Sequence, residues 1–469
     1  MASPTPFGAP MRKHFLIDPN YRNLNHGSFG TYPKPVLQAQ QSYQAALESR
    51  PDVYIRYTQP TLIDTSRERL ASLVKVPSSS IVLVKNATTA VNTILHNLTL
   101  AETLKAKDVV IYFETVYGAV ERALFALRDA NPGIRVRKVK VTFPMSDEEV
   151  VARFRRVVED VRREGLVPKL AVFETIVSLP GVRFPFETMV DVCKEEGILS
   201  LLDAAHGVGI IEVDLGRLGV DFWTSNCHKW LFTPRSCAIL YVAPQHQHLI
   251  RTSLPTSWGY IPAPRVGSQN ADEEGEEELT SVLPDTGKSA FITLFEFIGT
   301  TDDSAYACVP DALKFREQVC GGEEKIRSYL EHLAGEAGGI LAEALGTEVM
   351  LPDGGRKTAG GGLGCGMVTV RLPVRVVANG EESGGGGSGG CVQKKHVVPL
   401  ARWIETQLVE KGTFVPVFQH GEWLWTRLSA QVYLERRDFE WLADALKGVL
   451  GKVQGYLDTL KVPVDSSSS

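Results

Sequence analysis

One stretch of the chain, residues Leu201 to Phe232, most strongly limits its fold and its chemistry. It reads LLDAAHGVGIIEVDLGRLGVDFWTSNCHKWLF. An apolar run leads to Asp203, and a second apolar segment leads to Lys229 beside aromatic residues. Burial disfavours the charged form of both groups, and a desolvated lysine is a candidate for forming an imine. A surface lysine that follows a strand explains the same position without any chemistry.

Apolar runs alternate with amphipathic stretches along much of the chain. The runs at 80–85, 108–114 and 169–175 have the composition of buried strands, and helical stretches of about 12–18 residues separate such runs. This alternation predicts βαβ units and a mainly parallel sheet, and therefore an α/β fold. Because 469 residues exceed a single compact core, we expect two domains.

Two turns that follow these runs have ligand-binding chemistry. Residues 86–89, Asn-Ala-Thr-Thr, open a helical stretch, where free backbone N–H groups and the helix dipole suit a phosphate. An ordinary helix cap would use the same residues. Tyr117 follows the run at 108–114, where an aromatic ring can stack on a planar heterocycle or simply pack.

The motifs DAAHG and SNCHKW resemble the cofactor site of fold-type I pyridoxal phosphate (PLP) enzymes, in the class V aminotransferase and cysteine desulfurase superfamily. Five motifs, NATTA, TVYGA, DAAH, NCHK and RLSAQ, occur in the expected order along nearly the whole chain. The chain is most similar to the isopenicillin N epimerase-like branch. That branch contains the C–S lyase of fungal ergothioneine biosynthesis, hercynylcysteine sulfoxide lyase.

The resemblance implies a specific architecture. A large domain would carry a mainly parallel seven-stranded sheet between helices, and a smaller α+β domain would follow it. We expect an N-terminal arm at 1–30, the large PLP-binding domain at 31–308 and the small domain at 309–469. The small domain contains a Gly-rich insert at 379–391 with the composition of a linker.

The resemblance also implies roles around the cofactor ring. Lys229 would hold PLP covalently and act as the base at the substrate Cα. Asp203 would pair with the pyridine nitrogen and keep it protonated. Ala205 and Tyr117 would pack on opposite faces of the ring, and His206 and Ser178 would lie near its phenolic oxygen.

The phosphate and the substrate have their own implied residues. The phosphate group would be bound by residues of two subunits, namely Ala87, Thr88, Thr89, His228 and Thr300 from the partner. The substrate side would include Asn25, His26, Tyr54 and Arg56, although a solvated basic turn explains the last two equally well. Arg427 would bind the substrate carboxylate through its planar fork. The site would thus be completed only in a homodimer.

The residues named so far do not choose the reaction. Loss of the Cα proton can lead to epimerisation, transamination or β-elimination. The resemblance favours β-elimination from a cysteine S-conjugate or sulfoxide, specifically hercynylcysteine sulfoxide to ergothioneine with release of pyruvate and ammonia. The acid for the leaving group could be His26, Tyr117 or the partner's Tyr54. An epimerase, a cysteine desulfurase that uses a residue such as Cys391, and a cofactor-free scaffold remain alternatives.

Charge and cysteine content argue against several other functions. A net charge of −5 supplies no basic field for nucleic acid, and neither a long apolar run nor a signal-peptide core is present. Seven cysteines at scattered positions fit neither a disulfide framework nor a paired metal site. We therefore expect a cytoplasmic enzyme with reduced thiols and no metal, nucleic-acid or membrane partner.

Overall fold

Seven strands from the first half of the chain form one sheet. The computed structural model describes residues 4–262, 283–284, 287–351, 363–380 and 390–460. The strands are β1 (Ile81–Val84), β2 (Asp108–Phe113), β3 (Arg135–Val139), β4 (Val167–Glu174), β5 (Leu199–Asp203), β6 (Phe222–Asn226) and β7 (Ala238–Val242). Their order is β1-β7-β6-β5-β4-β2-β3, and of these seven only β7 runs against the others. The predicted mainly parallel sheet is confirmed.

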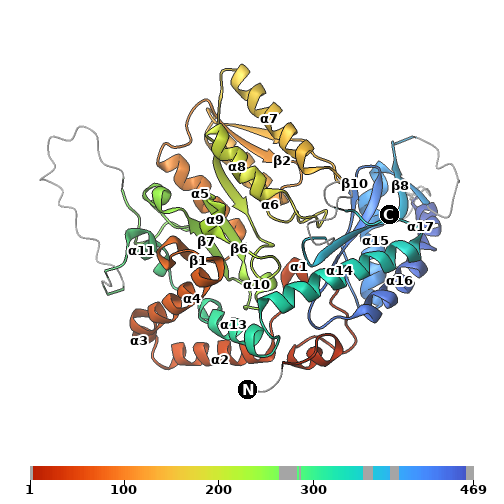
Figure 1. Cartoon of the computed structure of the whole chain (residues 1–469), viewed down its shortest axis with the longest axis horizontal. Coiled ribbons are helices and arrows are strands. Elements are labelled where there is room, and N and C mark those ends of the chain that lie inside the picture. The colour runs from red at the N-terminus through yellow and green to blue at the C-terminus, as the bar shows by residue number, and fades with distance from the viewer. Residues whose placement is uncertain (1–3, 263–282, 285–286, 352–362, 381–389, 461–469) are drawn as a thin grey trace, which may run out of the picture.

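Helices cover both faces of this sheet (Figure 1). Val109 and Ile111 of β2 pack into one cluster of buried side chains, and Val110 and Tyr112 pack into the other. The first cluster includes residues of α4 (Gln59–Val74), α7 (Asp147–Arg163) and α8 (Phe186–Glu196), and the second includes residues of α5 (Ala87–Leu100), α6 (Gly118–Ala130) and α11 (Ala290–Glu296). Burial on both faces explains why the strands are continuous apolar runs.

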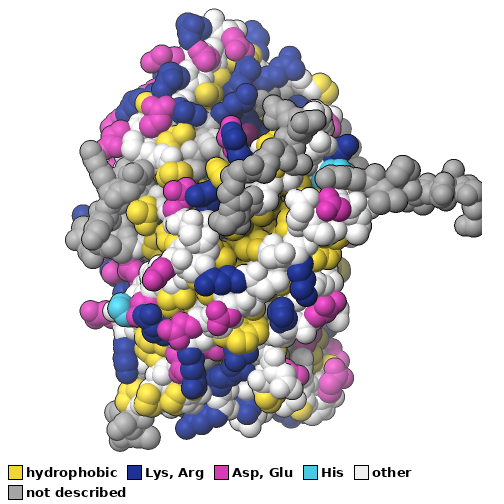
Figure 2. Space-filling model, turned by 90° about the vertical axis from the view of Figure 1, so that its right-hand side faces the viewer, with side chains coloured by type: hydrophobic (Ala, Val, Ile, Leu, Met, Phe, Trp, Pro, Cys, Tyr) yellow, Lys and Arg dark blue, Asp and Glu magenta, His cyan; other side chains and the backbone are white. Residues whose placement is uncertain are grey.

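A second sheet lies in the C-terminal part of the chain. It has the order β10-β11-β8-β9, formed by β8 (Met367–Val377), β9 (Gly390–Gln393), β10 (Val417–His420) and β11 (Trp423–Ser429). The helices packed with it are α14 (Glu323–Leu345), α15 (Val397–Glu410), α16 (Arg436–Leu450) and α17 (Val453–Thr459). On the face that these helices present, acidic and basic side chains are intermingled (Figure 2).

The domain limits predicted at 30 and 308 remain predictions. The helix α13 (Val309–Gln318) begins at the second of these limits, directly after α12 (Ser304–Ala307). Residues 381–389 of the predicted Gly-rich insert lie outside the described residues. Gly390 and Cys391, at the end of that insert, belong to β9.

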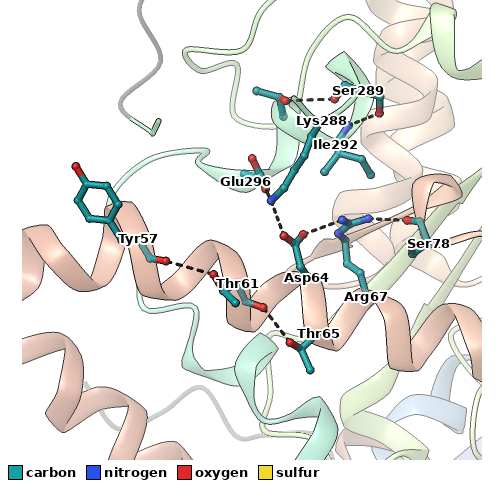
Figure 3. A network of polar contacts seen from close by, with 11 residues as sticks. Tyr57, Thr61, Asp64, Thr65, Arg67, Ser78, Lys288, Ser289, Ile292 and Glu296 are labelled. Carbon is teal, nitrogen blue, oxygen red and sulfur yellow. Dashed lines mark hydrogen bonds and ion pairs between the residues drawn. The ribbon is translucent and has the colours of Figure 1, made fainter. Parts of the chain in front are cut away.

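A polar network joins the segment at 287–296 to α4 (Figure 3). Lys288 Nζ lies 2.6 Å from Asp64 Oδ2 and also pairs with Glu296, which is buried. Arg67 donates to Asp64 Oδ1 over 2.8 Å and to the carbonyl of Ser78 over 2.6 Å. The network therefore fixes the start of α11 against α4, one of the helices that cover the large sheet.

The N-terminal arm packs against the short helix α10 (Cys227–Trp230), which carries Lys229. The arm includes a 3-10 turn at Ala9–His14 and the short helix α1 (His26–Phe29), and its backbone bonds to the second sheet, where the N–H of Ser429 donates to the carbonyl of Leu24. Gly30 has a φ of +64°, and a Cβ at this position would lie 1.9 Å from the carbonyl oxygen of His228. The arm can approach α10 this closely only because residue 30 is glycine.

Two absences can be stated for the described residues. None of the described helices is both long enough and apolar enough to cross a membrane. In the same residues, no three His, Cys, Asp or Glu side chains are grouped so that they could hold a metal ion.

We predict that Gly30→Ala destabilises the protein more than Gly346→Ala does. Gly346 has a nearly identical φ of +62°, but open space surrounds its missing Cβ. Both variants strain the backbone, and only Gly30→Ala adds a clash, which we expect to cost about 2 kcal/mol more. Chemical unfolding of the PLP-free protein measures the difference. Equal losses in the two variants would contradict the close contact between the arm and α10.

Candidate active site

The predicted cofactor residues gather at one edge of the large sheet. Strands β4 and β5 end at Glu174 and Asp203, which are paired neighbours in the sheet, and β6 leads directly into α10. The helices α5 and α6 begin shortly after β1 and β2 end at the same edge. Carboxyl ends of parallel strands are where open α/β sheets bind ligands, so the topology gathers these side chains as predicted.

Lys229 lies between a histidine and an acid. Its Nζ is 3.1 Å from Nε2 of His206, which is buried. Desolvation lowers the pKa of Lys229 to about 8, although the nearby Asp203 carboxylate opposes this change. Asp203 is buried and its Oδ1 accepts the N–H of Ala205 over 2.9 Å, while burial raises its pKa. A lysine in this state has a much larger amine fraction near neutral pH than a solvated lysine does.

The start of α5 leaves one backbone donor free. Asn86 caps the helix, and its Oδ1 accepts both the N–H and the hydroxyl of Thr89, over 2.8 and 3.1 Å. Asn226, at the end of β6, accepts the N–H of Ala87 over 2.9 Å. Within the described residues, the N–H of Thr88 has no hydrogen-bond partner. The cap is thus Asn86, and Thr88 remains available for an anion.

His228 faces the same region from α10. Its Nδ1 lies 2.9 Å from the carbonyl oxygen of Cys237, so this nitrogen carries the proton. Burial lowers the pKa of His228 to about 4, which leaves Nε2 as an acceptor. A neighbouring phosphate would favour the protonated ring, in which Nε2 becomes a donor.

Arg427, on β11, is a buried cation held by neutral groups. It donates to the carbonyl of Ser178 over 2.6 Å, to Oδ1 of Asn25 over 2.6 Å and to Oγ of Ser28 over 2.9 Å. Its Nε is buried without a partner, and no carboxylate among the described residues forms an ion pair with it. Desolvation lowers its pKa to about 10. This arrangement suits a carboxylate supplied by a ligand.

The side chain of His26 contacts the backbone of Lys229 and does not face an open site. Its Nε2 is 2.5 Å from the backbone carbonyl oxygen of Lys229, and its Nδ1 is 2.8 Å from the hydroxyl of Tyr433. It is buried, and desolvation lowers its pKa to about 3. With both nitrogens engaged, the geometry favours a role in positioning Lys229 over a role as an acid.

A second contact supports the same short helix. Arg316, from α13, donates to the carbonyl of Trp230 over 2.6 Å and to that of Gly209 over 3.0 Å. It pairs with Glu323 over 2.5 and 2.7 Å, and its guanidinium lies 5.0 Å from the ring centroid of Phe232. The carbonyls at the end of α10 are therefore satisfied by side chains from two other segments.

Of the predicted residues, His206 and His26 hydrogen-bond to Lys229 in the described single chain, whereas Tyr54, Arg56, Thr300 and Tyr117 have other surroundings. Tyr54 is buried near Asp302, and Arg56 pairs with Asp52 over 3.4 Å. Thr300 is exposed on a turn whose next residue, Thr301, accepts a bond from Lys85. Tyr117 is 50% exposed at the start of α6.

Glu174 is a site residue that no sequence motif predicted. It is buried beside Asp203, and it accepts the backbone N–H groups of Tyr117 and Ser178. Burial, followed by the charge of Asp203, raises its pKa well above the ordinary value. The sequence signal that could have identified Glu174 is its position at the end of a predicted strand, next to the strand that ends at Asp203. Asn226 and Trp230 were missed in the same way, although both stand inside the NCHKW motif.

Comparison with known proteins decides the family. Residues 29–258 match the aminotransferase class-V family model. L-cysteine desulfhydrase-like protein lolT1 of Epichloe uncinata is 40% identical over 450 residues, which cover 96% of this chain and 97% of the relative. The chain belongs to the aminotransferase class-V family. The match confirms the predicted family and, with it, a PLP-dependent enzyme.

Other members of the family show similar coverage. Hercynylcysteine sulfoxide lyase of Schizosaccharomyces pombe is 30% identical over 451 residues, covering 95% of this chain and 99% of the relative. The solved structure of the cystine C–S lyase C-DES has a TM-score of 0.67 at 18% identity, over 91% of this chain and 97% of that one. This structural likeness confirms the predicted PLP-transferase fold, with its large sheet and smaller C-terminal sheet.

We predict that Glu174→Gln makes the stability of the PLP-free protein less dependent on pH. The raised pKa means that the folded protein keeps a proton that the unfolded chain releases above about pH 4.3. Stability therefore falls as pH rises from that value toward the folded pKa, and glutamine removes this contribution. Melting temperatures between about pH 5 and 8 measure the effect.

The exposed Glu48 provides the control for this measurement. Glu48→Gln should reproduce the wild-type pH dependence, apart from a uniform offset. If the melting curves of Glu174→Gln and wild type stay parallel across the range, Glu174 does not hold the proton.

Proposed function

We propose that this chain is a C–S lyase that performs β-elimination on a cysteine S-conjugate or sulfoxide and releases pyruvate and ammonia. The observation that carries the proposal is Lys229, a lysine of lowered pKa beside Asp203, across from a buried arginine that has no carboxylate partner. Relatives named for cysteine desulfhydration and for sulfoxide cleavage support carbon–sulfur bond breakage as the outcome.

The residues present fit PLP. Lys229 supplies the amine for covalent attachment, Asp203 a buried acid for the pyridine nitrogen, and Thr88 a free N–H for the phosphate. His228 becomes a phosphate donor when it is protonated, and Tyr117 and Ala205 flank the ring. When bound, PLP supplies an electron sink for the pair of electrons left at the substrate Cα after deprotonation.

The protein residues would direct this chemistry to one bond. Arg427 holds the α-carboxylate of the substrate and is itself aimed by Asn25 and the carbonyl of Ser178. Lys229 would act as the base that removes the proton from Cα. Loss of the β sulfur group then requires a proton on the leaving group, at sulfur for a thiolate and at oxygen for a sulfenate. We assign this proton to Tyr117, because His26 is fully engaged behind Lys229.

For the substrate we propose hercynylcysteine sulfoxide, the substrate named for the S. pombe relative. Its quaternary ammonium would need an aromatic or acidic surface. Trp258 and Tyr260 are exposed to solvent, 53% and 36% respectively, and Trp423 is already covered by Arg371 at 4.1 Å. Arg251 also lies 5.8 Å from the ring centroid of Tyr260. Of the three, Trp258 is thus the aromatic group whose ring has no cation over it among the described residues.

A cysteine desulfurase is less well supported than the lyase. A desulfurase needs a reactive cysteine, and six of the seven cysteines are buried. The seventh, Cys391, lies in β9 at the edge of the second sheet, paired with Arg375 of β8. A persulfide on Cys391 after incubation with cysteine would favour the desulfurase.

We further propose a homodimer. Tyr57 and Tyr117 are large apolar groups that are 63% and 50% exposed in the single chain. Thr300 is also exposed, as expected of a residue that reaches a second subunit.

We predict that the purified protein takes up PLP, turns yellow and releases pyruvate from hercynylcysteine sulfoxide faster than from L-cysteine. Pyruvate formation coupled to NADH oxidation measures both rates.

Lys229→Ala should lose covalent PLP attachment and should lower the rate by at least about 10³-fold, because the base at Cα is removed. A colourless wild-type protein that gains no visible band with added PLP would support the cofactor-free scaffold instead. PLP uptake without pyruvate from either substrate would refute the lyase.

We predict that Arg427→Lys raises KM for the amino-acid substrate by roughly 10- to 100-fold, with a smaller change in kcat. Lysine keeps the charge and loses the planar fork that binds a carboxylate through two parallel bonds. Arg375→Lys on the neighbouring strand β8 is the matched control, because that guanidinium pairs with Glu422. Similar KM values for the two variants would contradict carboxylate binding by Arg427.

A further inference from the structure

We propose that Trp230 is a positioning residue that fixes the tautomer of His206, so that the imidazole presents only a donor, Nε2–H, toward the nitrogen of Lys229. Trp230 follows the lysine directly in the chain, and the function proposed above gives it no role. The inference deepens that function, because it concerns the group to which PLP attaches.

The hydrogen bond of Trp230 determines where the proton of His206 lies. Nε1 of Trp230 is 3.1 Å from Nδ1 of His206. An indole N–H can only donate, so Nδ1 must offer its lone pair. In a neutral imidazole the proton is then on Nε2. Trp230 and His206 are 0% and 2% exposed, so water does not compete for this contact.

The other side of the same ring faces the catalytic lysine. Nε2 of His206 is 3.1 Å from Nζ of Lys229. Because Nε2 carries the proton, it donates, and the lysine nitrogen can accept only as a neutral amine. An ammonium has no lone pair to offer. The pair Trp230 and His206 therefore selects the nucleophilic form of Lys229.

Neighbouring charges act in the same direction on His206. Burial disfavours an imidazolium, and so do the neighbouring charges of Lys229 and Arg427. Around Lys229, burial and Arg427 disfavour the ammonium and Asp203 favours it, whereas Glu174 adds no charge while it holds its proton. The hydrogen bond from His206 is thus one of the features that oppose Asp203.

Hydrogen bonds to the backbone of Trp230 and His206 help to hold the two rings in position. Arg316 donates to the carbonyl of Trp230 over 2.6 Å, and the hydroxyl of Thr175 donates to the carbonyl of His206 over 3.0 Å. These contacts hold the backbone of each residue and leave the indole N–H aimed at Nδ1. With PLP bound, the same Nε2–H would be the donor available to the phenolic oxygen of the cofactor.

Trp230→Phe removes the indole N–H and keeps an aromatic side chain. We expect the pKa of Lys229 in the PLP-free protein to rise by about 0.5–1 unit, because His206 can then adopt the other tautomer and accept from an ammonium. Competitive acetylation of Lys229 at a series of pH values, read by mass spectrometry, measures this pKa without any cofactor. In the PLP-loaded protein, the pH at which the visible band of the bound cofactor changes should also rise, because the phenolic oxygen loses a fixed donor.

Trp223→Phe is the matched control. Trp223 is likewise 0% exposed, but its Nε1 has no hydrogen-bond partner among the described residues. It should leave both midpoints unchanged. In a His206→Leu background the effect of Trp230→Phe should vanish, because leucine neither accepts from Trp230 nor donates to Lys229. If Trp230→Phe does not fold, benzothienylalanine at position 230 keeps the bicyclic shape and still lacks the N–H.

The outcomes separate this inference from the proposed function. An unchanged Lys229 midpoint in a folded variant that lacks the N–H overturns the role of Trp230, whether or not the wild type binds PLP. A shifted midpoint in a protein that never takes up PLP supports the role of Trp230 and refutes the proposed function.

Discussion

The site depends on how the end of one short helix is held. The helix α10 is only four residues long, so its carbonyl groups need partners from outside the helix. His26 binds the carbonyl of Lys229 and Arg316 binds that of Trp230, both from buried positions. Lys229 can therefore point into the site with a fixed backbone. The desolvation that lowers its pKa is created by the same packing.

Much of the fold and part of the site could be predicted from the sequence. Strands buried on both faces are continuous apolar runs, and residues that end such strands, such as Asp203, must meet at one edge of a parallel sheet. Lys229 and Arg427 stand in motifs with a recognisable order, which is why the sequence predicts roles for both. Local spacing was sufficient wherever the topology itself placed the residue.

The remaining features depend on contacts between distant segments. His26 reads as a substrate residue until its two nitrogens are seen to bind Lys229 and Tyr433. Glu174 looks like any polar end of a strand, and its proton follows from burial next to Asp203. An ordinary helix cap was the alternative interpretation of residues 86–89, and Asn86 provides that cap while Asn226 takes a second donor. No local sequence pattern determines which side chain accepts such a hydrogen bond.

The arm that carries His26 has a consequence for how the protein is made. His26 and Tyr433 are 407 positions apart, and Arg427 and Asn25 are 402 apart. During synthesis from the N-terminus, the arm therefore leaves the ribosome long before its partners exist. The large sheet and α10 can form while the C-terminal part of the arm's binding site is still missing, and domains generally fold as units in that order. Completion of the active site is then among the last steps of folding, so a nascent chain that stops short of β11 would hold Lys229 without Arg427 and without Tyr433, the residue that binds Nδ1 of His26.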